Sequence, residues 1–478
     1  MRKPSARRWL LAAVIPLGIC ARPLEVRLLD PVRSYGGASG ASIRAVVTSA
    51  YQNREQVWLP VGTVLLGSVE DARPVGIGLA RERARLRLGF NAYQLPDGRI
   101  FPISVHLRRI DNARETVEAD GTIKGIIAAN NPQSLVGGLW SRPDTLVLHR
   151  SVFGLTGLTG RIWSQFSMGP IGAGALIATR LALIRMPEPE IQLPSGTDLI
   201  LSVESLSDDA PSFAREQRPS AEAETADWIR ALPFEITKPG NRSSKDLINV
   251  AIEGSREELE AAFAAAGWQK AEPLNRRSVS RAYHAYTTQT GYASAPASKL
   301  FYRGEEPEFI FQKSLNTMAK RHHVRLWRAE RDGREIWLGA GTHDIGVMFE
   351  PGAMTFSHRI HPRIDGERTK ILNDLSFAGC VAQAAYVDRP AAVRKGGADM
   401  IYSDGRIASI RLQACAGTDA AVDQSALKPL RWPAARMVRR AVLEARNYVL
   451  RGNPYYWAYR AIRWRPSAQE LHMPGVEE

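Results

Sequence analysis

The chain has 478 residues, of which 44% are apolar, so it is long enough for about two to four domains with cores of their own. This composition excludes a chain that is disordered throughout. The formal net charge of +14 favours anionic partners such as phosphate, lipid head groups or nucleic acid. Because the charge comes mostly from scattered arginines and no nucleic-acid-binding motif accompanies them, we expect no nucleic-acid partner.

The N-terminus has the layout of a secretory signal. It starts with four basic residues, Arg2, Lys3, Arg7 and Arg8. A short apolar run from Leu10 to Ile19 follows, and it is too short for a stable membrane span. We interpret residues 1–21 as a signal peptide or, alternatively, as an uncleaved N-terminal anchor. The protein is therefore expected to be exported to the periplasm or cell envelope.

Three cysteines occur, and Cys20 lies in the signal region. Cys380 and Cys415 remain as a pair. In an oxidising compartment they can form a disulfide, and otherwise they are two buried apolar thiols. The sequence leaves both alternatives open.

Residues 24–204 are predicted to form a β-rich domain, either a barrel or a sandwich. Apolar and polar residues alternate from Ala84 to Ala92 and again from Ile103 to Arg108. This period of two is typical of strands with one buried face. The turn pair Asp97-Gly98 lies between the two runs, which predicts a β-hairpin.

An internal echo links two distant parts of this domain. Residues Leu59–Glu70 and Leu193–Glu204 each contain Pro, then Gly, then an apolar strand that starts with Thr. The pattern predicts the same turn and strand entry twice. The insert at residues 166–185 is rich in Gly and Ala and contains Arg180; it is either a connector packed on the β-domain or a membrane-touching helical hairpin.

Residues 205–227 have the composition of a linker, and a mixed α/β domain is predicted at 228–423. Ser255 and Glu258 form a capping box before a helix that stops at Gly267. A second helix is expected at 366–378, with Asp365 as its N-cap. The predicted fold class is therefore α+β and multidomain, with a β-rich barrel or sandwich followed by a mixed α/β domain.

Five of the nine histidines lie between His322 and His361. If Asp332-Gly333 is the turn of a hairpin, His322 lies opposite His343, with Cβ atoms about 4.5–5.5 Å apart. Two imidazoles at that spacing can share a metal ion or a phosphate group. The predicted site has three groups of residues: catalytic His322, His343 and His358; metal-binding His322, His343 and Asp344; and ligand-binding His323, Arg325, Arg359, His361, Arg363 and Arg368.

This cluster suits an anionic substrate, and metal-assisted or histidine-based phosphoester hydrolysis is the reaction class it favours. A structural role is the alternative, with one ring stacked on Trp327 or Trp337 and the other bonded to backbone. No His-Glu-x-x-His signature occurs. A divalent metal cofactor and enzymatic activity therefore both stay open.

Several motifs between residues 228 and 411 resemble the LssY C-terminal domain family. They are Ile252-Glu253-Gly254-Ser255, the segment ending at Trp268, Ala295–Phe301, His322–Trp327, Thr342-His343-Asp344, His358-Arg359-Ile360 with Asp365–Arg368, and Tyr402–Arg406. Domains of this family are often joined to membrane phosphatase or transporter-like segments, which implies a link to envelope lipids. The resemblance carries no catalytic roles.

The tail at 424–478 is basic and aromatic, and helical in pattern. Such a helix either lies on an anionic membrane or docks on its own protein. Two functions follow from the whole sequence. The first is a non-enzymatic envelope protein that binds an anionic or lipid-linked ligand through the LssY-like domain, with the envelope membrane or anionic lipid as partner. The second is a hydrolase of a phosphorylated or lipid-linked envelope substrate.

Overall fold

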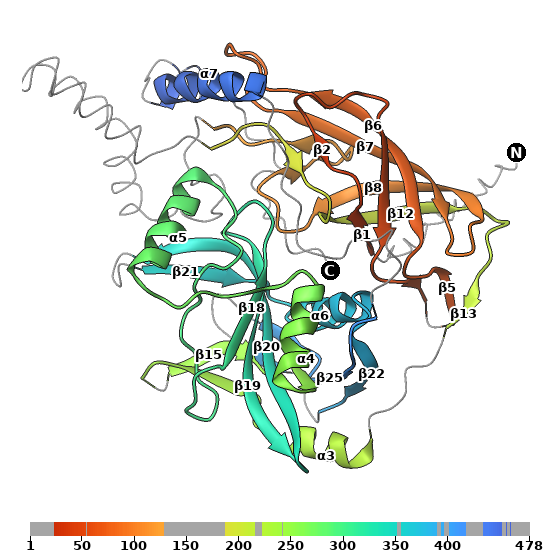
Figure 1. The fold of residues 1–478 in the computed structure, drawn as a ribbon, viewed down its shortest axis with the longest axis vertical. Helices are drawn as coiled ribbons and strands as arrows, with labels where there is room; N and C mark the ends of the chain where they lie inside the picture. Colours follow the sequence, from red (N-terminus) through yellow and green to blue (C-terminus); the bar gives the residue numbers. More distant parts are fainter. Residues whose placement is uncertain are drawn as a thin grey trace, which may run out of the picture.

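The computed structural model describes residues 23–53, 55–128, 187–215, 222–240, 242–350, 355–389, 393–395, 401–416 and 434–451, together with Tyr456 and Tyr459. The predicted signal segment and the Gly/Ala-rich insert lie outside the described residues. The described chain forms an N-terminal β-barrel and a C-terminal mixed α/β domain, drawn one above the other in Figure 1. The predicted α+β fold class is confirmed, and of the two predicted N-terminal architectures the barrel is the one present.

The barrel consists of antiparallel strands that close on themselves. The order is β6–β3–β1–β12–β8–β7, and β7 pairs back with β6. Their bounds are β1 Pro23–Leu28, β3 Ser42–Val47, β6 Val64–Arg73, β7 Arg85–Gln94, β8 Ile100–Ile110 and β12 Asp198–Leu206. Alternate side chains such as Leu24, Val26 and Leu199 point inward and are fully buried. Closure leaves no edge among these six strands, which protects the barrel from pairing with other chains.

Short strands decorate the barrel. They are β2 Val32–Arg33, β4 Tyr51–Gln52, β5 Gln56–Leu59, β9 Thr116–Val117, β10 Ile123–Lys124, β11 Gln192–Leu193 and β13 Phe213–Ala214. The pair β9–β10 extends the sheet beyond β7, and β11 pairs with β2. Strand β13, which falls inside the predicted linker, pairs with β5 and therefore stays attached to the barrel domain.

Both predicted β-features of the barrel are confirmed. Strands β7 and β8 pair across the Asp97-Gly98 turn, with Tyr93 opposite Phe101. The internal echo also forms the same structure twice. Gly62 and Gly196 have φ angles of 89° and 88°, a region that glycine adopts without strain. Each turn leads into a long barrel strand, β6 or β12.

The C-terminal domain is a sheet with helices on both faces. The strand order is β17–β18–β19–β20–β16–β25–β22, with β21 paired to β20; among these described strands, only β16 and β25 run parallel to each other. The strands of this sheet are β16 Val250–Glu253, β17 Gln269–Lys270, β18 Phe309–Lys313, β19 Arg321–Arg331, β20 Arg334–Glu350, β21 Thr355–Ile360, β22 Val381–Val387 and β25 Ile407–Leu412. Two separate strand pairs complete the domain: β14 Glu235–Lys238 with β15 Arg242–Leu247, and β23 Val393–Lys395 with β24 Ile401–Ser403. The helices are α3 Ala223–Ala231, α4 Arg256–Ala265, α5 Arg276–Thr288 and α6 Asp365–Phe377.

Alternation along the central strands divides this core into two layers. Val324, Leu326 and Trp337 face α4 and α6, whereas Trp327 and Leu338 belong to the layer that α3 covers. Neighbouring residues of a strand point to opposite faces, so each strand serves both layers. Helix α6 therefore lies over the sheet on the side that faces the barrel (Figure 1).

The two helix predictions have different outcomes. The capping box is confirmed, since the Ser255 side chain accepts from the backbone of Glu258 and the Glu258 carboxylate accepts from the backbone of Ser255. The prediction that Asp365 is the N-cap of α6 is wrong. Ile364 is the N-cap, and the Asp365 carboxylate instead accepts hydrogen bonds from the Ser403 hydroxyl and the Asp404 backbone. Asp365 thus ties the start of α6 to β24 and the residue that follows it.

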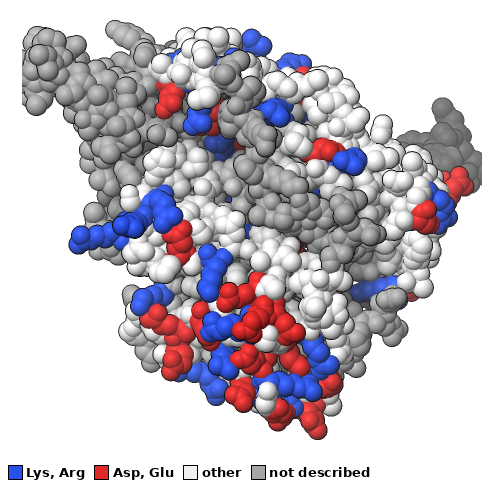
Figure 2. All heavy atoms as spheres, in the orientation of Figure 1, with Lys and Arg blue, Asp and Glu red and all other residues white. Residues whose placement is uncertain are grey.

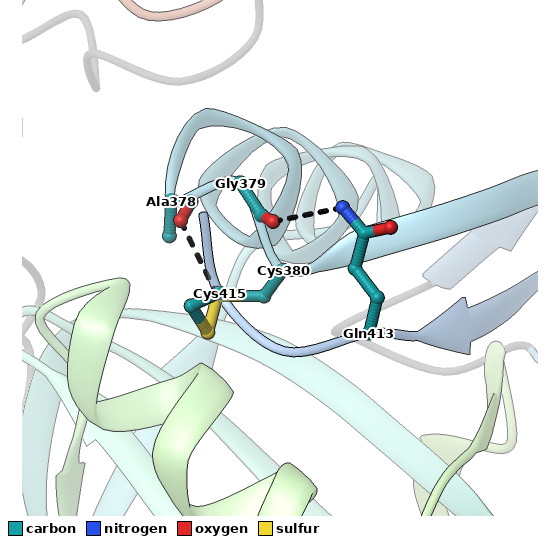
Figure 3. Close-up of a disulfide and its surroundings, with 5 residues drawn as sticks. All are labelled: Ala378, Gly379, Cys380, Gln413 and Cys415. Atoms are coloured by element: carbon teal, nitrogen blue, oxygen red, sulfur yellow. Dashed lines mark hydrogen bonds between the residues drawn. A yellow bond between two sulfur atoms is a disulfide. The ribbon is translucent and has the colours of Figure 1, made fainter. Parts of the chain in front are cut away.

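Cys380 and Cys415 form a disulfide (Figure 3). It joins the residue just before β22 to the chain just after β25, across a sequence separation of 35. The Gln413 side-chain amide donates to the carbonyl of Gly379 at 3.1 Å, which connects the same two chain segments a second time. Of the two alternatives left by the sequence, the structure has the disulfide.

Removal of this disulfide is expected to lower the free energy of unfolding by about 2–4 kcal/mol, since the cross-link restricts the unfolded chain. The measurement is denaturant unfolding of the wild type with and without a phosphine reductant. A Cys415→Ala variant is the control, because it should match the reduced wild type and show no response to the reductant. An equal response in the variant would contradict the prediction.

Helix α7, Ala434–Arg451, lies on the barrel domain (Figure 1). Leu443 joins the barrel core, and Arg439 pairs with Glu190 at 2.8 Å. Met437 and Val438 on another side of the helix are 65% and 67% exposed. The side that docks therefore carries arginine together with Leu443, whereas Met437 and Val438 face solvent. Within the described residues, no helix has the length and apolar character that a membrane crossing requires.

Candidate functional site

The predicted histidine hairpin is confirmed in its register. β19 and β20 pair across Asp332-Gly333, with His322 opposite His343 and Arg321 opposite Asp344. Asp332 and Gly333 have φ angles of 51° and 74°, as a tight two-residue hairpin turn requires. The His322 and His343 rings stack with centroids 4.3 Å apart and an interplanar angle of 25°.

His322 is held between two carboxylates from different parts of the chain. Its Nδ1 lies 2.6 Å from Glu367 Oε2 of α6, and its Nε2 lies 2.7 Å from Asp111 Oδ2, which follows barrel strand β8. Burial alone would lower the pKa of His322, but the two carboxylates outweigh it and raise the pKa to about 10. His322 is therefore an imidazolium at neutral pH that links the two domains.

Gly341 positions Glu367 for this contact. A Cβ atom at Gly341 would lie 2.5 Å from Ile371 Cδ1 and 3.2 Å from Glu367 Cγ. The missing side chain lets α6 approach β20 closely. A side chain at this position would force the Ile371 side chain to move and would press on the Glu367 side chain that contacts His322.

His343 connects the buried ring to the surface. Its Nε2 lies 2.9 Å from Asn112 Oδ1, and because the Asn112 amide nitrogen donates to the carbonyl of Lys313, Oδ1 is the acceptor. Burial and the charge of His322 hold the pKa of His343 well below its usual value, so its ring is neutral. The His361 ring follows, with its centroid 6.3 Å from that of His343 and an interplanar angle of 21°.

The structure thus brings together three stacked rings, which we call the histidine column: His322, His343 and His361. His322 is buried, whereas His343 and His361 are partly exposed. The chain after β8 and the C-terminal domain both line the column. A continuous path of imidazoles therefore runs from a buried pair of carboxylates to solvent.

Asp344 does not join this column. It follows His343 in β20 and so points to the opposite face of the sheet. There its carboxylate accepts from Arg321 Nε at 2.9 Å and lies 3.1 Å from His358 Nδ1. The predicted metal set of His322, His343 and Asp344 is therefore not assembled, and His358 is separated from the other two histidines predicted to be catalytic.

Asp111, and not the predicted Asp344, is the carboxylate that lies beside His322 and His343. One ligand atom from each of Asp111, His322 and His343 lies within 4.8 Å of the other two. This is a carboxylate and two imidazoles, a donor set that suits divalent transition metals. The aspartate comes from the barrel domain, 211 residues before His322.

Most of the predicted ligand-binding residues have protein partners. His323 is buried against the Thr342 hydroxyl at 2.7 Å. Arg325 donates to Asp246 at 2.9 Å, and Arg368 donates to Asp404 at 2.6 Å. Arg359 lies partly buried on β21. Of the six, Arg363 is exposed and His361 is partly exposed, both at the outer end of the column.

Two arginines, Arg109 and Arg363, lie at the outer end of the column, and we call them the basic rim. Both arginines are exposed, and both lower the pKa of His361, after the larger effect of burial. Arg109 also opposes the protonation of His343. Elsewhere, on the face drawn in Figure 2, acidic and basic side chains are mixed at the end of the molecule opposite the barrel.

A buried charge network lies beside the column and joins the domains. Asp198 of the barrel forms ion pairs with Arg27 at 2.7 Å, with Lys370 at 3.0 Å and with Lys313 at 3.1 Å. Asp374 of α6 pairs with Lys370 at 2.9 Å. Burial alone would raise the pKa of Asp198, but Arg27 and the two lysines hold it well below its usual value. The network therefore consists of charged groups that compensate one another.

Sequence reasoning missed Asp111, Asn112, Glu367 and Lys370. The only local signal is the polar pair Asp111-Asn112 directly after a strand, where Asn112 adopts a φ angle of 52°. Nothing in the spacing links these residues to histidines that follow 211 and 231 positions later. Glu367 lies in the segment that carries the family resemblance, but a buried glutamate on a helix gives no pattern of its own.

The C-terminal domain matches a known family. Residues 229–407 match the LssY C-terminus family. The match covers α4, α5, α6 and the strands of the sheet except β25, of which it includes only Ile407, so we call this part the LssY domain. It confirms the resemblance drawn from the motifs and contains His322, His343, His361 and Glu367.

No curated protein matches the chain. ComB10 of the Com type IV secretion system of Helicobacter pylori, a solved structure, aligns with 41% of this chain and 95% of its own at 10% identity, with a TM-score of 0.19. That similarity is too low to support an inference about this chain. Asp111 and Asn112 lie outside the matched residues, so the LssY domain completes its histidine site with residues from the barrel.

Proposed function

We propose that this protein is an exported cell-envelope protein that binds an anionic, phosphate-bearing or lipid-linked ligand at the basic rim without chemical turnover. The observation that carries the proposal is the outer end of the histidine column. There two partly exposed imidazoles, His343 and His361, lie beside the exposed guanidinium groups of Arg109 and Arg363. Arginine and histidine together favour phosphate and other anions.

Two further observations support this proposal. The inner ring, His322, has both nitrogens bonded to carboxylates, so it is not poised to act as a base. The Cys380–Cys415 disulfide is typical of proteins in oxidising compartments, which agrees with the predicted export signal. A column whose inner ring is bonded on both sides, and whose outer end carries arginines, suits binding of an anion better than acid–base catalysis.

The rim is tested by titration of the full-length protein with inorganic phosphate in a calorimeter. Arg363→Ala and Arg109→Ala are each expected to weaken binding by about tenfold, the size of one charge-assisted hydrogen bond. Arg328→Ala is the matched control, because Arg328 is exposed and pairs with Glu335 far along β19 from the column. Unchanged phosphate affinity in both rim variants would exclude the proposed site.

A vesicle measurement separates a lipid head group from a free phosphate. If the ligand is lipid-linked, phosphatidylglycerol vesicles bind the protein through the rim and through the exposed apolar side of α7. Val442→Glu is then expected to weaken vesicle binding about tenfold and to leave phosphate binding unchanged. Val61→Glu is the control, since Val61 is 43% exposed, against 45% for Val442, but lies on a barrel turn. Phosphate binding without vesicle binding would assign a soluble anion.

A hydrolase is the second candidate, and one observation favours it. The His343 ring is partly exposed at the rim and its orientation is set by the Asn112 side chain, which is the geometric requirement for a general base. The test is turnover of bis(p-nitrophenyl) phosphate by the wild type and by His343→Ala. Turnover that disappears in this variant supports the hydrolase, whereas binding without turnover supports the first proposal.

A further inference from the structure

We propose that Asp111, His322 and His343 bind one divalent transition-metal ion at the boundary between the barrel and the LssY domain. The ion would be shared by two domains, with its carboxylate from the barrel and its imidazoles from β19 and β20. The proposal concerns the inner part of the histidine column. It does not depend on whether an anion binds at the rim.

The first argument is the geometry of the donor atoms. One ligand atom from each of the three residues lies within 4.8 Å of the others. Bonds of about 2.0–2.2 Å to a tetrahedral ion would bring such atoms to roughly 3.4 Å from one another. The Asp111 and His322 atoms, which are 2.7 Å apart, would therefore move slightly apart on metal binding, and the partly exposed His343 ring can adjust to them.

The second argument is that groups which orient metal-binding imidazoles are already in place. Histidine ligands usually donate the N–H of their second ring nitrogen to a carboxylate or carbonyl oxygen, which fixes the tautomer. Glu367 Oε2 accepts from His322 Nδ1 at 2.6 Å, which leaves Nε2 toward Asp111. Asn112 Oδ1 accepts from His343 Nε2 at 2.9 Å, which makes Nδ1 the nitrogen with a lone pair. Each ring therefore has one nitrogen held by an orienting oxygen, which fixes the plane of the ring before an ion binds.

The third argument is the position of the acidic side chains. The carboxylates of Asp111 and Glu367 lie on either side of the His322 ring, 2.7 Å and 2.6 Å from its two nitrogens. Carboxylate oxygens and imidazole nitrogens together are donors that divalent transition metals prefer. The inner end of the column is therefore acidic in composition, whereas the arginines lie at its outer end.

The experiment measures zinc binding by the full-length protein after removal of metals with a chelator. Equilibrium dialysis against Zn²⁺, followed by elemental analysis, is expected to give one ion per chain. Asp111→Asn and His343→Ala should each weaken binding at least tenfold, and Glu367→Gln, which removes only an orienting group, by about 10–100-fold. His106→Ala is the control, because the His106 ring lies on the barrel and bonds to the carbonyl of Ala119.

A second readout covers the case in which Asp111→Asn fails to fold. Co²⁺ bound to a nitrogen and oxygen site absorbs visible light, and this absorption should be absent in His343→Ala, a variant altered at a partly exposed residue. The proposal is wrong if the folded wild type binds no stoichiometric Zn²⁺ or Co²⁺, or if His343→Ala binds both as the wild type does. Arg363→Ala distinguishes the two proposals, since it should weaken phosphate binding and leave zinc binding unchanged.

Discussion

Asp198→Asn is expected to lower the free energy of unfolding by about 3–5 kcal/mol, because it removes one of the two carboxylates that three buried cations share. Asp198 forms ion pairs with Arg27, Lys313 and Lys370, and the side chains of all three are nearly buried. In the variant, Asp374 is the carboxylate left in ion-pair contact with all three of these cations. Denaturant unfolding followed by circular dichroism measures the change.

The control for this prediction is an ion pair of similar geometry on the surface. Asp30 forms an ion pair with Arg44 at 3.0 Å, but the Arg44 side chain is 56% exposed. Asp30→Asn is therefore expected to change stability by less than about 1 kcal/mol. If the two variants lose similar amounts of stability, burial does not govern the contribution of the charge network to the domain junction.

The second large effect is a loss of stability at alkaline pH that comes from His322. Its pKa is raised to about 10 in the folded protein, above the ordinary value of 6.5, so the folded state binds the proton more tightly than the unfolded state does. This contribution is fully present below about pH 6.5 and is lost as the pH rises toward 10. Within that window, stability should fall by at most roughly 1.4 kcal/mol per pH unit from this group.

The measurement is the free energy of unfolding at several pH values, with a chelator present so that no metal competes for His322. The comparison is with His322→Gln, which keeps a hydrogen-bonding side chain but cannot be protonated. The wild type should lose its advantage over this variant between pH 6.5 and 10, and Asp111→Asn should shift the loss to lower pH. Parallel curves for the wild type and His322→Gln would show that the ring is not charged in the folded protein.

Predictions from local sequence patterns held where neighbours along the chain determine the structure. The Asp332-Gly333 turn fixes the register of β19 and β20, so the pairing of His322 with His343 could be worked out from positions alone. The same reasoning predicted the hairpin at Asp97-Gly98 and the capping box at Ser255. In each case a few adjacent residues supply both the turn and the pattern of burial.

Predictions about side-chain partners failed where the partner lies far away in the sequence. Asp344 was expected beside His343, but adjacent strand residues face opposite ways, and its carboxylate meets Arg321 instead. Asp365 had the right position for a cap, yet its oxygens bind Ser403 and the Asp404 backbone from a different strand region. Sequence spacing shows which residues are neighbours on an element but does not show what packs against that element.

By itself, the sequence determined the fold class, the family of residues 229–407, the histidine hairpin and the repeated turn in the barrel. The fold class, the hairpin and the turn follow from local turn geometry and from the alternation of burial along strands, whereas the family follows from the resemblance of short motifs. Only the tertiary structure decided that Asp111 and Asn112 of the barrel complete the histidine site and that α7 docks by its arginine side. Such contacts form between surfaces brought together by folding, and no periodicity in the chain records them.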